Sequence, residues 1–365
     1  MPEPSQPELP IARVAVDMPL SHLDHPFDYA VTAEQDAAAI PGARVRVRFA
    51  GRLRDGFILE RVATGDHEGA LAPLSKIVSS EPVLTTEIAK LIRKVADHYA
   101  GTFADVMRLA VPPRHAATEQ AERGRTRCSL PDDHPAGPLV DYPTGPGFLA
   151  ALRGGDHPRA MWQVTPSAAP SGDWALGLAA AARACADSER GAVIIVPDQA
   201  DLDRLGEACT QLLGATGFAV LVAEAGPAAR YRAFLSALRG EVRVVIGNRA
   251  AAYAPVHDLG LVALWDDGDD LLAEQRAPYP HARDVLALRA DSADAGVLFA
   301  SHARTTELQA WVERGWLREL ADDRVIVRHT APRVKVTADS DLAIERDPAA
   351  RAARLPHEVF EMMRA

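Results

Sequence analysis

Short segments in which apolar and polar residues alternate mark the first part of the chain. In ARVRVRF (43–49) the apolar side chains alternate with Arg44, Arg46 and Arg48, which is the period of a strand with one buried face. Further segments of strand character are 11–20, 27–31 and 55–62. Because glycines supply turns between these segments, we predict a small, strongly curved sheet or barrel.

A helical spacing of apolar residues follows over residues 84–108. Pro112 and Pro113 end this segment, since proline breaks helices. Residues 114–147 then combine arginines with five prolines, a composition typical of a linker. We therefore predict an N-terminal domain over residues 1–113 that folds by itself, followed by a linker over 114–147.

From about residue 148 to 320, helical segments alternate with continuous apolar runs that suit buried parallel strands. These runs are 192–197, 218–223, 242–247, 259–267 and 296–301. The alternation predicts a doubly wound domain with helices on both faces of a parallel sheet. The predicted fold class is therefore α/β, preceded by a small β-rich domain. Residues 321–365 add a short strand and a helix.

Composition narrows the class of function. The 365 residues carry a net charge of −10, which argues against a broad polyanion-binding surface but leaves room for a small DNA-end site. Cys128, Cys185 and Cys209 form no CxxC pair, and no histidine has metal-ligand spacing, so we predict no metal site. No signal peptide or membrane span is visible, which fits a cytoplasmic protein.

Six segments of the α/β part carry a specific resemblance. They are TPSAAPSGDWALGL (165–178), VIIVPDQADLDRL (193–205), VVIGNRAAAYAPVHDLG (244–260), LVALWDDGDD (261–270), PYPHARDV (278–285) and FASHARTTEL (299–308). Their order and spacing resemble the first lobe of superfamily 2 DNA helicases, and most closely the PriA family of replication restart helicases. Residues 17–31, 42–52 and 75–84 are similar to that family's DNA-binding domain. The resemblance implies a RecA-like helicase lobe over residues 148–320.

The segment that would grip nucleotide phosphates departs from the family pattern. Where the family has TGSGKT, this chain has PSAAPSGD, which ends in Ser171, Gly172 and Asp173. The prolines remove backbone N–H donors, and Asp173 places a negative charge near the lysine position. No lysine occurs between Lys94 and Lys335, although phosphoryl transfer by such proteins uses one.

Two further nucleotide motifs are altered. Asp266 and Asp267 begin the segment that replaces the family's DEEH box, and residues 300–303 replace its GSAT motif with ASHA. Asp266 retains the capacity to hold Mg²⁺, whereas Asp267 is one methylene shorter than the glutamate that positions water. We therefore predict a degenerate nucleotide site, no catalytic residue and no ATP hydrolysis.

The resemblance also implies a pocket for the 3′ end of a DNA strand. Phe27, Asp28 and Tyr29 match the family's FDY motif, and Lys76 matches a lysine that precedes its SEPV segment. An aromatic ring stacks on a base, a carboxylate accepts from the 3′ hydroxyl, and an ammonium group contacts phosphate. Gly51 would allow close approach of the backbone. The alternative is that the aromatic residues are core residues of the sheet and Asp28 caps a turn.

Arginines supply the remaining candidate DNA contacts. The arginines predicted to share one face are Arg44, Arg46, Arg48, Arg52 and Arg54. They form either a phosphate track or a solvated face. Arg249, which matches the family's GTR motif, contacts either single-stranded DNA or a neighbouring carboxylate. His281 matches the HARD segment, for which we favour a structural role at the start of a helix.

These observations favour a DNA-binding and scaffolding protein of replication restart, with links to DNA repair and recombination. It would bind forked DNA in the nucleoid and recruit primosome or helicase-loading proteins and the single-strand DNA-binding protein. The alternatives are an active ATP-dependent 3′→5′ helicase and an unrelated α/β enzyme. The family uses ATP, Mg²⁺ and zinc, but we expect no cofactor in this chain.

Parts of the family pattern are not found in this sequence. The segment 114–147 is too short and proline-rich for the family's winged helix, and the zinc-binding cysteines are not present. PHEVFEMMRA (356–365) resembles the first helix of the family's second lobe. We therefore interpret residues 321–365 as the start of an incomplete second lobe, and the chain as a fragment or a truncated form.

Overall fold

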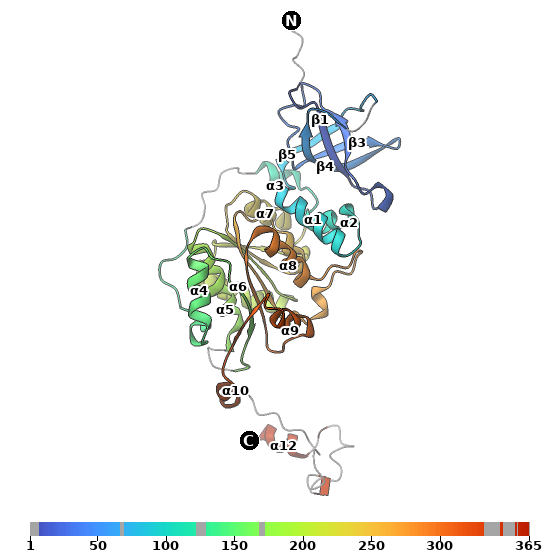
Figure 1. Ribbon diagram of the computed structural model, residues 1–365. Helices are drawn as coiled ribbons and strands as arrows, with labels where there is room; N and C mark the ends of the chain where they lie inside the picture. The colour runs from blue at the N-terminus through green and yellow to red at the C-terminus, as the bar shows by residue number, and fades with distance from the viewer. Residues whose placement is uncertain are drawn as a thin grey trace.

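Two sheets organise the chain, a small antiparallel one near the N-terminus and a larger parallel one covered by helices (Figure 1). The computed structural model describes residues 7–65, 69–121, 129–167, 172–331, 344–345, 355 and 357–364. The predicted fold class, a small β-rich part followed by a doubly wound α/β part, is confirmed.

The N-terminal sheet curls almost into a barrel. Its strands are β1 (Ile11–Val16), β2 (Phe27–Ala30), β3 (Ala43–Phe49), β4 (Arg52–Val62) and β5 (Lys76–Pro82). They pair antiparallel in the order β2-β1-β4-β3-β5, and the short 3-10 helix η1 (Ser21–Leu23) lies between β1 and β2. A bridge between Ala30 and Pro73 links edge strand β2 to the segment that precedes β5. In β3, Val45 and Val47 are buried whereas the alternating Arg44, Arg46 and Arg48 are not, as the alternation predicts.

Helices α1 (Thr86–His98) and α2 (Phe103–Ala110) follow this sheet. Each is directly preceded by a threonine, Thr85 or Thr102, whose side chain accepts from a backbone N–H three residues on and so satisfies one of the free donors of the first turn. Their apolar faces pack against α8 (Ala282–Ala293) and the 3-10 helix η5 (Arg249–Tyr253), and one continuous apolar cluster contains all four. The predicted domain boundary after residue 113 therefore does not coincide with a break in the packing.

The larger sheet has seven parallel strands in the order β12-β6-β11-β10-β7-β9-β8. They are β6 (Arg159–Gln163), β7 (Gly191–Ile195), β8 (Phe218–Leu221), β9 (Val244–Gly247), β10 (Leu259–Trp265), β11 (Gly296–Ser301) and β12 (Arg318–Ala321). Since all strands run the same way, the segments that carry the recognised motifs meet at the edge formed by the carboxyl ends of the strands.

Helices cover both faces of this sheet (Figure 1). One face is covered by α4 (Gly145–Arg153), α5 (Trp174–Asp187) and α6 (Gln199–Leu213). The other is covered by α7 (Pro227–Leu238), α8 and α9 (Thr306–Glu313). Two 3-10 turns, η4 (Ala223–Ala225) and η6 (Asp270–Leu272), lie in the connections that follow β8 and β10.

The segment predicted to be a linker contains folded elements. Helix α3 (Ala116–Gln120) and the 3-10 helix η2 (Pro138–Asp141) lie within it, and α4 begins at its end. Thr118, Glu119 and Leu139 are buried. The prediction of a simple linker is wrong for these parts, because their side chains are packed against the rest of the molecule.

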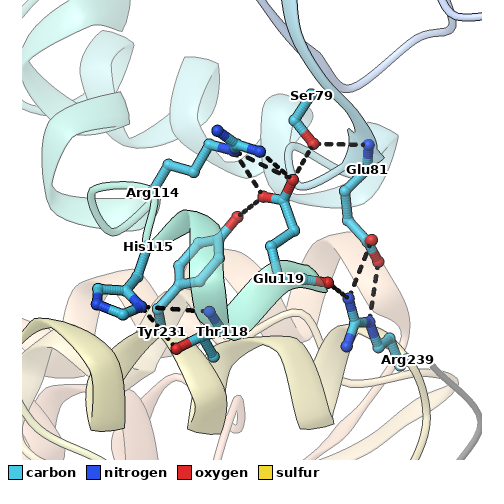
Figure 2. Close-up of polar contacts among 8 residues, drawn as sticks. All are labelled: Ser79, Glu81, Arg114, His115, Thr118, Glu119, Tyr231 and Arg239. Carbon is cyan, nitrogen blue, oxygen red and sulfur yellow. Dashed lines mark hydrogen bonds and ion pairs between the residues drawn. The ribbon is translucent and has the colours of Figure 1, made fainter. Parts of the chain in front are cut away.

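Glu119 lies where α3, β5 and α7 meet (Figure 2). It is only 4% exposed. Its carboxylate accepts from the Arg114 guanidinium at 2.9–3.1 Å, from Ser79 Oγ at 2.6 Å and from Tyr231 Oη at 2.7 Å. Burial alone would raise the pKa of Glu119, but these hydrogen bonds and the Arg114 charge lower it below its ordinary value.

A second contact runs beside Glu119. Arg239, the C-cap residue that directly follows α7, forms an ion pair with Glu81 of β5 at 3.0 Å and donates to the Glu119 carbonyl oxygen at 3.1 Å (Figure 2). We call these residues together the polar clamp: Ser79, Glu81, Arg114, Glu119, Tyr231 and Arg239. The polar clamp ties the antiparallel sheet to the parallel-sheet part through a helix that lies between them in the sequence.

After β12 the chain forms α10 (Arg324–Thr330) and, near the C-terminus, α12 (His357–Arg364). Much of the predicted start of a second lobe, residues 321–365, lies outside the described residues. Among the described residues, none of the helices combines the length and the apolar character needed to cross a membrane.

Candidate functional sites

A cavity of about 670 Å³ opens at edge strand β2, where the 3′-end pocket is predicted. Phe27, Asp28 and Tyr29 all line it. The Phe27 ring packs edge-on against Phe49, with ring centroids 4.7 Å apart, and the centroid of the His25 ring lies 4.3 Å from that of Phe27. The structure therefore brings an aromatic group and a carboxylate to one cavity, as the 3′-end prediction requires.

Asp28 is held at the cavity wall by a cation. Its side chain is 10% exposed, and Arg13 Nε lies 3.6 Å from its Oδ1. Arg13 also donates to Glu60 at 2.9 Å, so it bridges two carboxylates. Gly65 lies so close that a Cβ there would be 2.4 Å from Asp28 Oδ2. Sequence reasoning missed Arg13, whose position directly opposite Asp28 follows only from the register of β1 and β2.

Tyr29 belongs to the core as much as to the cavity. It is 4% exposed, its hydroxyl donates to the Arg48 carbonyl oxygen at 3.4 Å, and burial raises its pKa. Gly51 forms the turn between β3 and β4 together with Ala50, at φ values of +76° and +46°. A Cβ at Gly51 would meet open space, so it is the backbone conformation of the turn that favours glycine there.

The arginines of β3 do not form one track. Arg44 turns toward the helices, where its Nη2 donates to the Pro112 carbonyl oxygen at 3.1 Å and its guanidinium lies over the Phe57 ring at 4.6 Å. Burial lowers the pKa of Arg44. Arg48, by contrast, is exposed and lines the cavity. Of the predicted track, Arg48 is therefore the arginine that reaches the pocket.

The other predicted cations lie outside the cavity. Arg46 pairs with Asp55 at 2.9 Å, and Lys76 is an exposed residue directly opposite Arg46. The structure does not place Lys76 among the residues that line the pocket. Arg52 and Arg54 lie opposite apolar positions of β3, so the prediction that they share the face of the β3 arginines is wrong.

The segment predicted to be a degenerate nucleotide site begins after β6. Ser171 lies outside the described residues. Gly172 packs tightly against the backbone before it, since a Cβ at this position would be 2.4 Å from the Ser167 carbonyl oxygen. The two ends of this loop therefore touch, which leaves little room between them.

Asp173 occupies the N-terminus of α5, the place where a phosphate-binding helix would offer free N–H groups. Its carboxylate accepts from the Leu176 N–H at 3.2 Å and pairs with Arg204 at 3.2 Å. The next residue, Trp174, is 3% exposed and stacks on Trp265 with centroids 4.3 Å apart and an interplanar angle of 7°. A carboxylate and a stacked aromatic pair thus occupy the start of this helix.

Asp266 and Asp267 follow β10 at the same edge of the sheet. Burial and the nearby Asp269 raise the pKa of Asp266. Asp267 is 2% exposed and receives hydrogen bonds from Arg283 at 3.2 Å and from Thr305 at 2.6 Å. Burial nevertheless raises the pKa of Asp267. The described part of the chain contains no group of three or more His, Cys, Asp or Glu side chains that could hold a metal ion.

Arg249 forms the ion pair that was one of its two predicted roles. Its Nε lies 3.1 Å from Glu274, and its Nη1 donates to the Leu271 carbonyl oxygen at 2.9 Å. His281 caps α8 by accepting from the Arg283 N–H at 3.2 Å, so its predicted place at a helix start is confirmed.

Comparison with known proteins agrees with this arrangement. A family model described as the PriA 3′ DNA-binding domain (3′BD) matches residues 13–112. The chain is 49% identical over 338 residues to the probable replication restart protein PriA of Mycobacterium tuberculosis (strain CDC 1551), a match that covers 92% of this chain and 51% of that protein. The corresponding Mycobacterium leprae protein is 48% identical over 339 residues, with 92% and 51% covered. The chain thus spans about half the length of the curated relatives it matches.

Likeness to solved structures is weaker. The C-terminal domain of S. cerevisiae Dbp5, in its complex with Gle1 and IP6, aligns with a TM-score of 0.32 and 13% identity, covering 47% of this chain and 97% of that one. The strand order of the parallel sheet, rather than this alignment, describes the fold.

The fold and the matches together define a class of protein, one in which an antiparallel sheet that matches a 3′ DNA-binding domain is joined to a RecA-like lobe. Within that class the chain belongs to the PriA-like replication restart proteins, and the resemblance drawn from its motifs is confirmed.

Proposed function

We propose that this chain binds the 3′ end of a DNA strand at stalled or branched replication forks and takes part in primosome assembly, without hydrolysing ATP. The relatives bear the name of replication restart proteins, and the matched family model is that of a 3′ DNA-binding domain. Replication restart or helicase-loading proteins and the single-strand DNA-binding protein are the proposed partners.

The observation that carries the proposal is the cavity at β2. It combines the half-buried Phe27 ring, the Asp28 carboxylate and the exposed Arg48 in a single hollow. A terminal base stacks on an aromatic face, a 3′ hydroxyl donates to a carboxylate, and a phosphodiester pairs with a guanidinium. The three groups therefore match the base, the 3′ hydroxyl and the phosphodiester of a terminal nucleotide.

The arrangement at α5 supports the absence of ATP hydrolysis. Asp173 already accepts from the N–H group that a phosphate would need, and its negative charge would repel a triphosphate. Asp267, which would position water, is instead bound by Arg283 and Thr305. Phosphoryl transfer requires charged groups that are positioned around the phosphates. In this chain Asp173 and Asp267 instead contact other groups of the protein.

The test compares forked DNA that ends in a 3′ hydroxyl with the same fork ending in a 3′ phosphate, by fluorescence anisotropy with the full chain. The hydroxyl end should bind more tightly, because a phosphate would face the Asp28 carboxylate. Asp28→Ala should weaken hydroxyl-end binding and reduce the discrimination. Glu34→Ala, which removes an exposed acid outside the cavity, serves as the control.

Equal affinity for both ends in the unmodified chain would contradict the end-binding proposal. The ATP part is tested separately by phosphate release in the presence of forked DNA. A release above background that Asp266→Ala abolishes would overturn the absence of hydrolysis while leaving the end-binding proposal untouched.

A further inference from the structure

A mostly apolar cavity of about 390 Å³ lies where the antiparallel sheet meets α1 and α2. Its walls come from β1, from the connection between β1 and β2, from β4 and from the two helices. It is distinct from the cavity at β2, although His25 and Pro26 line both. Small-molecule sites in proteins usually have volumes of about 300–1,000 Å³ and mainly apolar walls. This cavity therefore has the size and the character of a small-molecule site.

Small side chains account for this cavity. Ala15 of β1, Ala89 of α1 and Ala104 of α2 all line it. Larger apolar residues complete the wall, among them Val16, Met18, Leu23, Ile58 and Phe103. Because protein interiors are otherwise close-packed, a single methyl group from each of three elements leaves space that longer side chains would fill. A ligand with an apolar body would occupy that space and remove its own surface from water.

Most of the charge around the cavity is already neutralised within the protein. Arg93 Nη1 lies 2.6 Å from Asp24 Oδ2, and the other Asp24 oxygen accepts from the Phe103 N–H at 2.7 Å. Glu60, which also lines the cavity, pairs with Arg13 at 2.9 Å. Since both lining carboxylates have partners, neither of them favours a cationic ligand.

Lys90 differs from these groups. It lines the cavity, it is exposed, and within the described residues it takes part in no hydrogen bond or ion pair. Arg93 adds a second donor, because its Nε is buried and has no hydrogen-bond partner in the same part of the chain. Thr86, Lys90 and Arg93 are spaced four and three residues apart in α1, so they lie on one face of the helix. That face therefore offers several donors, and the Lys90 charge on it is unmatched.

From this geometry we propose that the cavity binds a small molecule with an apolar body and a single carboxylate at one end. The apolar body lies among the alanines and the larger apolar residues, and the carboxylate accepts from Lys90 and from Arg93 Nε. An ionised carboxylate has only acceptor sites, which complements a helix face that offers donors. The proposal does not depend on DNA binding, because Phe27, Asp28 and Arg48 do not line this cavity.

The test uses three probes that share a naphthalene ring and differ in charge: naphthylacetate, naphthylacetamide and naphthylethylamine. Binding of each probe to the full chain is measured by isothermal titration calorimetry. Naphthylacetate should bind more tightly than the neutral amide. The cationic amine should bind most weakly, because the Lys90 charge repels it.

Lys90→Met keeps an apolar side chain of similar length and removes the charge. It should weaken binding of naphthylacetate about threefold to fivefold, the effect of one partly exposed ion pair, and leave binding of naphthylacetamide unchanged. The matched control is Lys94→Met, because Lys94 is an exposed lysine of the same helix that does not line the cavity.

Ala89→Phe tests the apolar part of the proposal, since a phenyl group at this position should fill the cavity and abolish binding of all three probes. Ala150→Phe, at an exposed position of α4 outside the cavity, is its control. Phe27→Ala alters the cavity at β2 and should retain binding of the probes. Circular dichroism establishes that each variant is folded.

Absence of binding by all three probes would overturn the proposal, and so would equal affinity for naphthylacetate in Lys90→Met and in the unmodified chain. Loss of binding in Phe27→Ala, with binding retained in Ala89→Phe, would place the probes in the cavity at β2 and contradict the proposal as well. If Ala89→Phe did not fold, the comparison of Lys90→Met with Lys94→Met would still decide the question. The 3′-end proposal is measured separately with forked DNA, so the two can fail independently.

Discussion

At the scale of single residues, the proposed DNA-end pocket depends on neighbouring residues of one edge strand. Successive residues of a strand point to opposite faces, and the cavity at β2 is lined by Phe27 and Asp28 from both of them. Phe27 packs against Phe49 at the hairpin of β3 and β4, whereas Asp28 faces Arg13 of β1. The ring and the carboxylate are thus positioned independently, so they can be tested separately.

Removal of the Phe27 ring should weaken binding of a 3′-hydroxyl fork by about 1–3 kcal/mol, the scale of one base stacked on an aromatic ring. The measurement is a titration of Phe27→Ala with fluorescent forked DNA. The matched control is Leu53→Ala, because Leu53 is an apolar residue of the adjacent hairpin that is 55% exposed and does not line the cavity. An equal loss in both variants would show that the effect is not stacking.

At the scale of elements, the polar clamp connects β5, α3 and α7 through hydrogen bonds and ion pairs (Figure 2). Glu119 has a pKa below its ordinary value of 4.5, so the unfolded chain binds this proton more readily than the folded one. The stabilisation that the Glu119 carboxylate provides is therefore complete at pH values above the ordinary pKa of glutamate. It is lost as the pH falls through the lower pKa that Glu119 has in the folded state.

Glu119→Gln should reduce the free energy of unfolding near neutral pH by about 2–3 kcal/mol, since it removes a charge that Arg114 and two hydroxyls contact. It should also flatten the decline in stability at acidic pH. Urea unfolding at a series of pH values gives both quantities. Glu313→Gln, at an exposed position of α9, is the control. If the free energy of unfolding decreased equally at acidic pH in Glu119→Gln and in the unmodified chain, the polar clamp would not be the cause of that decrease.

At the scale of the whole molecule, α1 and α2 link the antiparallel sheet to the parallel-sheet part. They follow the antiparallel sheet in sequence, yet their apolar faces pack against α8 and η5. Separating residues 1–113 would expose these faces to water, at a cost of about 25 cal/mol for each Å² of apolar surface. Whether residues 1–113 fold by themselves stays a prediction, and this packing leads us to expect that they are less stable alone than in the full chain.

We expect the chain to unfold as one cooperative unit. All five tryptophans lie between residues 162 and 316, so their fluorescence follows the parallel-sheet part, whereas far-ultraviolet circular dichroism follows both sheets. The two signals should give the same urea midpoint. Isolated residues 1–113 should have a lower midpoint than the full chain and bind an apolar dye. Two separated midpoints in the full chain would show that the sheets are independent.

The sequence was most informative where a repeating period decides the structure. The alternation in β3 predicted its buried and exposed faces, and the apolar runs predicted β7 to β11. A repeating hydrophobic pattern predicts on which face of a strand or helix a side chain lies. It does not predict which residues of other elements contact that side chain. Arg44 therefore looked like a surface residue, although Pro112 and Phe57, which are distant in the sequence, hold it between the sheet and the helices.

The partners of the candidate sites could not be predicted for the same reason. Arg13 and Asp28 meet through strand register, and Glu119 lies in a proline-rich segment whose composition suggested a linker. Family motifs gave the order of the sites, whereas only the folded chain shows which charges are already paired.

The carboxylate at the start of α5 has one further consequence. In a protein whose helix is completed by a bound anion, stability increases with the concentration of that anion. Asp173 is part of the polypeptide, so its effective concentration at the Leu176 N–H is fixed by the chain and never diluted. We therefore expect the stability of this helix start to be independent of the concentration of free nucleotide or phosphate.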